Sequence, residues 1–144
     1  PRARVLATAY LGIVPSSAAP RLPADTAWHP VDDLPPTAFD HRDFITAAID
    51  RLRAKLSYTN VGFALAPEEF TLSELRDIIS AALGYRVTQT NLARVMTRRR
   101  LIEPAGGRAQ PGPSGGRPAM RYRFRARTLE VTDPFAVLKP PRDG

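Results

Sequence analysis

The chain of 144 residues contains no cysteine and only two histidines, His29 and His41. Disulfides and thiolate metal sites are therefore excluded, and two histidines so far apart do not suggest a zinc site. No apolar run approaches the ~18 residues that a membrane-spanning helix needs. These absences fit a reducing compartment, and we expect the protein in the cytoplasm.

The sequence also lacks a catalytic constellation. Its acidic pairs, Asp32–Asp33 and Glu68–Glu69, are adjacent along the chain, and neighbouring side chains on a strand or helix point to different sides. Turn and capping roles suit these residues better than paired acid–base work. His41 follows a predicted helix cap, and Ser16, Ser17 and Ser114 have no base nearby. We therefore expect no enzymatic activity, no metal and no cofactor in this chain.

Positive charge, in contrast, is concentrated in one part of the chain. Residues 84–127 carry 11 arginines against Glu103 alone, a net charge of +10, whereas residues 1–83 have a net charge of −2. The planar fork of arginine suits phosphates and guanine edges. This uneven distribution indicates a polyanionic partner for the second half of the chain.

The basic half begins with two predicted helices. Thr71 and Glu74 form a capping-box pattern, and Gly84 is the expected terminator of the helix that follows. Thr88 is expected to cap a second helix over about residues 89–100. The apolar face of the first helix comprises Leu72, Leu75, Ile78, Ile79 and Ala82, and that of the second comprises Leu92, Val95 and Met96.

Two strands and a basic loop are predicted next. Residues 101–104 form a short strand, and residues 105–119 are too rich in glycine, proline and arginine to pack. Apolar side chains and arginines alternate strictly over residues 120–125. On a strand, this pattern turns Met120, Tyr122 and Phe124 inward and three arginines outward. A winged helix-turn-helix, which reads DNA, has this order of elements: helix, turn, basic helix, strand, basic loop and strand.

The predicted DNA contacts lie on the second helix and on the wing, which is the basic loop of residues 105–119 together with the two strands that flank it. We expect the helix to read bases in the major groove and the wing arginines to touch phosphates or the minor groove. The alternative is a solvated basic helix followed by a solubilising loop. The residues predicted to bind DNA are Thr88, Gln89, Thr90, Asn91, Arg94, Arg98, Arg99, Arg108, Arg117, Arg121 and Arg123.

The sequence before residue 58 predicts two strands and a helix. Residues 4–14 read as a buried strand, and residues 25–31 as a second strand that buries Trp28. Asp40 is expected to cap a helix over about residues 41–57, with an apolar stripe that could bridge two domains. Residues 57–67, a short helix or strand, would deliver apolar side chains to a core. The tail from residue 128 has room for an extra strand.

Three blocks of this sequence resemble the Nudix-related transcriptional regulators. They are PRARVLATAYLGIVP, AWHPVDDLPPTAFDH and RLRAKLSYTNVGFALAPEEFTLSELRDII, in this order, with GRPAMRYRF in the last predicted strand. The resemblance implies a homodimer in which an N-terminal Nudix-like domain precedes a winged helix and represses genes of NAD or sugar metabolism. It also implies that ADP-ribose or a related compound releases the DNA. Arg2 and Arg4 fall in a segment that lies near the effector site in relatives.

One family feature is absent from the sequence. The Nudix box, a glycine followed by a glutamate cluster that binds magnesium, has no counterpart among the glutamates of this chain. Magnesium would be a cofactor only if sequence upstream carried an intact box. The rival readings are a fragment of a Nudix hydrolase of the ADP-ribose pyrophosphatase type, with a structural winged helix, and a protein- or RNA-interaction module.

The expected fold class is α+β, the truncated C-terminal part of a Nudix-like α/β fold joined to a winged helix-turn-helix. Residues 1–57 would form the Nudix-like part with its linking helix. Residues 58–127 would form the DNA-binding domain, and residues 128–144 the tail.

Overall fold

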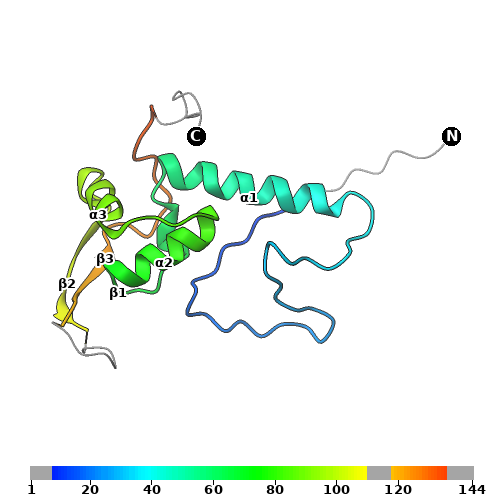
Figure 1. The fold of residues 1–144 in the computed structure, drawn as a ribbon, viewed down its shortest axis with the longest axis horizontal. Coiled ribbons are helices and arrows are strands. Elements are labelled where there is room, and N and C mark those ends of the chain that lie inside the picture. Colours follow the sequence, from blue (N-terminus) through cyan, green and yellow to red (C-terminus); the bar gives the residue numbers. More distant parts are fainter. Residues whose placement is uncertain (1–7, 110–117, 136–144) are drawn as a thin grey trace.

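The computed structural model describes residues 8–109 and 118–135. It has the α+β winged-helix architecture that the sequence predicts: helices and a small antiparallel sheet form one cluster, and the longest helix extends from it (Figure 1). The elements, in order, are α1 (His41–Tyr58), a 3₁₀ helix (Val61–Ala64), β1 (Phe70–Thr71), α2 (Leu72–Leu83), α3 (Gln89–Arg98), β2 (Ile102–Arg108) and β3 (Met120–Phe124).

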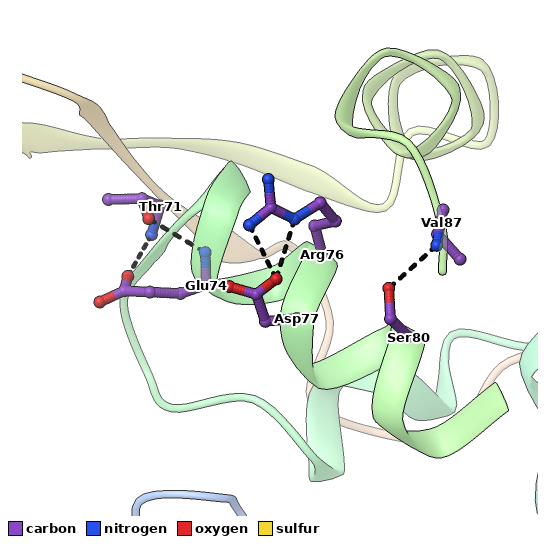
Figure 2. A network of polar contacts seen from close by, with 6 residues as sticks. All are labelled: Thr71, Glu74, Arg76, Asp77, Ser80 and Val87. Atoms are coloured by element: carbon purple, nitrogen blue, oxygen red, sulfur yellow. Dashed lines mark hydrogen bonds and ion pairs between the residues drawn. The ribbon is translucent and has the colours of Figure 1, made fainter. Parts of the chain in front are cut away.

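Helix α2 begins and ends as its sequence predicts. The Thr71 hydroxyl accepts from the Glu74 amide at 3.2 Å, and the Glu74 carboxylate accepts from the Thr71 amide at 2.7 Å, which completes the capping box (Figure 2). Gly84 ends the helix in the left-handed region, with φ of 78°. The turn to α3 is tied back to α2, because the Val87 amide donates to Ser80 Oγ at 3.0 Å (Figure 2).

Helix α3 is capped by Thr88, whose hydroxyl accepts from the Asn91 amide at 3.3 Å. It ends slightly earlier than the predicted residue 100. Arg100 adopts φ of 52°, and the Leu101 amide then donates to the Met96 carbonyl at 2.9 Å. This is the hydrogen bond of a Schellman ending, with arginine at the position that glycine usually occupies.

The three-stranded sheet has the order β1-β3-β2, and both pairs are antiparallel. Strand β2 is longer than predicted, since it pairs with β3 beyond an irregularity between Pro104 and Arg108. The prediction that Met120 faces inward is wrong: its side chain is 48% exposed, because it lies opposite Arg108, away from the helices. Phe124 is buried, and its ring lies 5.4 Å from that of Phe70.

One hydrophobic core joins the helices to the sheet. It is built from side chains of β1, α2, α3 and β3 and of the connections between them, so the sheet stacks against α2 and α3. The buried members are Ala66, Phe70, Leu75, Ile79, Val87, Leu92, Met96, Leu101 and Phe124.

Helix α1 has the predicted extent, but Asp40 does not cap it through its side chain. Its apolar stripe is only half-buried. The tail packs against the end of this helix. The Asn60 amide donates to the Thr128 carbonyl at 2.8 Å, and its oxygen accepts from the Glu130 amide at 2.8 Å. In place of a further strand, the described tail makes one bridge, between Thr59 and Val131.

The two strands predicted before α1 are absent from the described residues 8–40, which form an open loop beside α1 and α2 (Figure 1). Trp28, predicted to be buried, is 66% exposed, and Tyr10 is 91% exposed. The physical reason is that an extended segment becomes a strand only when neighbouring strands satisfy its backbone groups. The described chain offers this segment no such partner.

Candidate nucleic-acid interface

The outward face of α3 is the candidate DNA-reading surface. With Leu92 and Met96 pointing into the core, the opposite side of the helix presents Thr90, Arg94 and Arg98, all exposed. Asn91 lies at the edge of this face and is also exposed. A capped, well-anchored helix therefore holds a polar surface that makes no contact with the core.

Asn91 and Arg94 form a preorganised pair on this surface. Arg94 Nη2 donates to Asn91 Oδ1 at 2.9 Å, across one helical turn. The contact holds the amide in one orientation and leaves further guanidinium donors of Arg94 available. Asparagine and arginine are the side chains that pair with adenine and guanine edges in the major groove, so the arrangement suits base readout.

The other predicted residues of α3 divide into two groups. Gln89 is exposed in the first turn, whereas Thr88 is exposed but uses its hydroxyl as the helix cap. Arg99, predicted to bind DNA, is turned inward. Successive residues of a helix differ by about 100° around its axis, so Arg98 points outward while Arg99 points back toward α1.

The Arg99 guanidinium joins three segments of the fold. It donates to the Thr59 carbonyl at 2.7 Å, to the Leu56 carbonyl at 3.4 Å, and from Nε to Thr132 Oγ1 at 3.0 Å. Burial lowers the pKa of Arg99, because desolvation disfavours the charged form, while the charge of Asp133 opposes this. These contacts give Arg99 a structural role at the junction of α1, α3 and the tail.

The wing arginines differ in how far their charge is offset. Arg108 is exposed at the end of β2. Arg123 Nε contacts Glu103 Oε1 at 2.8 Å, across the strand pair, and Arg121 lies 3.9 Å from Glu69. Carboxylates thus partly neutralise two of the predicted phosphate contacts. Arg117 lies outside the described residues, as do the predicted effector residues Arg2 and Arg4.

Further polar and basic side chains lie beside the predicted residues. A hollow between α3 and the sheet is lined in part by Thr97, Arg100 and Arg125. Arg125 continues the alternating arginines of β3, which was the available sequence signal. Arg100 directly follows the predicted Arg98 and Arg99, and its left-handed backbone moves it off the helical register.

Two kinds of feature are absent from the described residues. No helix within residues 8–109 and 118–135 is both long and apolar enough to cross a bilayer. In the same part of the chain, no three histidine, aspartate or glutamate side chains converge as metal ligands would.

Comparisons with known proteins place the module. Residues 62–124 match the family described as the NrtR DNA-binding winged helix domain. The "ADPR responsive transcriptional repressor NtrR" of Acinetobacter baylyi is 37% identical over 107 residues, which are 73% of this chain and 40% of that protein. The chain thus spans well under half the length of this relative.

Solved structures agree with the sequence match. The structure of Shewanella oneidensis NrtR complexed with a 27mer DNA has a TM-score of 0.51 and 35% identity, and the match covers 62% of this chain and 40% of that one. A second structure of Shewanella oneidensis NrtR gives a TM-score of 0.50 at 35% identity, over 62% of this chain and 39% of that one. Residues 62–124 of this chain are therefore an NrtR-type winged-helix DNA-binding domain.

Proposed function

We propose that the full-length protein is a transcriptional repressor that binds double-stranded DNA as a homodimer in the cytoplasm and is controlled by ADP-ribose or a related metabolite. The observation that carries the DNA-binding part is the exposed face of α3, where Asn91 and Arg94 are held together on a domain of the NrtR type. The effector is proposed because the matched relative is named for its response to ADPR.

Base readout is assigned to the outward face of α3. Arg94 occupies the middle of that face, with Thr90 and Arg98 on either side and Asn91 at its edge. Arg94 suits a guanine edge and Asn91 suits an adenine edge, whereas Arg98 is assigned to the phosphate backbone of the DNA. The cap at Thr88 and the buried Leu92 and Met96 hold this surface in place, so little ordering accompanies binding.

The wing supplies backbone contacts. Arg108 is the described wing arginine with the fewest restraints, and Arg117 belongs to the same proposed set by sequence. Arg121 and Arg123 contribute less, since Glu69 and Glu103 compete with phosphate for their guanidinium groups. The charge-assisted contacts make binding fall steeply with salt.

The chain itself is proposed to regulate and not to catalyse. We assign it no hydrolysis of ADP-ribose, because the sequence contains no Nudix box. Incubation of the purified chain with ADP-ribose and magnesium should leave the compound intact, and magnesium-dependent turnover would contradict this assignment.

Selection of bound duplexes from a random library, with and without ADP-ribose, tests the proposed function in the full-length protein. A defined palindromic site should emerge, and ADP-ribose should reduce its recovery. If no duplex sequence were enriched, the proposal would be refuted.

A further inference from the structure

A cavity of about 510 Å³ lies on the side of α3 that faces α1. The second half of α1 forms one wall, the α2–α3 turn forms another, and the inner flank of α3 forms the third. Volumes in this range hold small organic ligands, which bind in mostly apolar clefts with a few polar groups that orient them. The cavity meets α3 through Asn91, Leu92, Val95 and Met96, so it borders the DNA-reading face at Asn91 and extends from there toward the core.

The floor of the cavity is apolar. It reaches side chains of the domain core, among them Ile79, Leu92 and Phe124, which are otherwise almost fully buried. A ligand that reaches this floor must present an apolar body, because a polar group there would lose its hydration without a protein partner.

The charged side chains that line the cavity are all cationic. Arg53, Arg86 and Arg99 contribute to the lining, and no aspartate or glutamate of the described residues does. Arg99 already donates to backbone carbonyls and to Thr132, so it contributes positive charge to the cavity but is not a group that a ligand would bind directly. Arg53 and Arg86 are thus the groups that an anion would contact.

Arg53 has unused hydrogen-bonding capacity. Its Nε is covered and has no acceptor among the described residues. The nearest paired carboxylate, that of Asp50, lies 4.0 Å from Nη1, beyond hydrogen-bond distance. The guanidinium rests against Gly84, where a Cβ would lie 2.5 Å from Nη2. Because Arg53 lines the cavity, rotation of its side chain would offer these donors to an anion bound there.

From this combination we infer that the cavity binds a small organic acid, with an aromatic or branched apolar body on the core floor and a carboxylate at Arg53. The inference goes beyond DNA binding and does not depend on it. Charge complementarity selects the acid over a neutral compound, and the depth of the apolar floor selects it over a simple inorganic anion.

The test uses 3-phenylpropionate as the probe and the 144-residue chain as the protein. Two-dimensional amide NMR should show saturable shifts at Val87 and Val95, with a dissociation constant on the order of 1 mM or tighter. The neutral amide of the probe should bind about tenfold more weakly. Acetate, which has the charge without the apolar body, should produce no saturable shifts there.

Two variants and a matched control separate the parts of the site. Arg53→Gln should abolish the preference for the acid over its amide, and Val95→Phe should fill the cavity and abolish binding of both. Arg51→Gln removes an exposed arginine of the same helix and should leave both affinities unchanged.

Four results would overturn the inference. The first is that 3-phenylpropionate produces no saturable shifts, and the second is that its shifts are confined to the outward residues Arg94 and Arg98. The third is that Arg51→Gln and Arg53→Gln change the affinities for the acid and its amide equally. The fourth is concentration-dependent dimerisation that Val95→Phe abolishes. The last would assign the cavity to a second copy of the chain.

Discussion

Replacement of Arg99 by alanine should destabilise the fold, although arginine beside another arginine on a basic helix looks like a DNA contact. The side chain links the end of α3 to the last carbonyls of α1 and to Thr132 of the tail. A cation at the carbonyl end of α1 also interacts favourably with the helix dipole. Alanine would remove these contacts together.

The expected loss follows from the acceptors that are left behind. Thr59 is only 3% exposed, so its carbonyl would lose its 2.7 Å donor in a place that water reaches poorly. A hydrogen bond to a charged group contributes about 1.5–3 kcal/mol. The site is partly open, which allows some rehydration at Leu56 and Thr132. We therefore expect a net loss of about 2 kcal/mol in the free energy of unfolding.

Urea unfolding of the chain measures this loss. With a slope of roughly 1–3 kcal/mol/M, the midpoint should fall by about 1 M. Arg98→Ala is the matched control: it removes the neighbouring exposed arginine and should change stability by less than ~0.5 kcal/mol while weakening DNA binding. If Arg99→Ala and Arg98→Ala unfold at the same urea concentration, the structural role of Arg99 is wrong.

Four further changes test other parts of the fold and the interface. Arg94→Ala should cost about 1–3 kcal/mol of binding at a specific site, because its guanidinium reads a base edge, and a gel shift with unchanged affinity would contradict this. Arg108→Ala should lower the slope of log affinity against log salt by about 0.9 on specific and random duplexes alike, whereas a loss confined to one base position would argue against a phosphate contact. Thr71→Ala removes the capping box of α2 and should destabilise the chain by ~1 kcal/mol in thermal unfolding; an unchanged midpoint would show that the cap is not needed. Arg100→Gly should stabilise it by about 0.5–1 kcal/mol, since only glycine adopts a φ of 52° without steric cost, and a destabilised variant would mean that the Arg100 side chain holds the α3 ending.

The winged-helix module could be predicted because its signals are local. Thr71 with Glu74, Gly84 and Thr88 mark helix ends within a few residues, and those contacts are the ones observed. The outward position of Arg94 follows from a helical period of 3.6 residues once Leu92 and Met96 are assigned to the core. Predictions of this kind need no knowledge of distant parts of the chain.

Other features depend on contacts between residues far apart in sequence. Arg98 and Arg99 are chemically identical neighbours, and their different roles follow from the position of α1 and of Thr132, which approach only in the folded chain. Trp28 was predicted to be buried because it is apolar, yet burial requires a covering surface that the described chain does not provide. Periodicity predicts which way a side chain points, whereas the residues that it contacts there are set by packing across the whole fold.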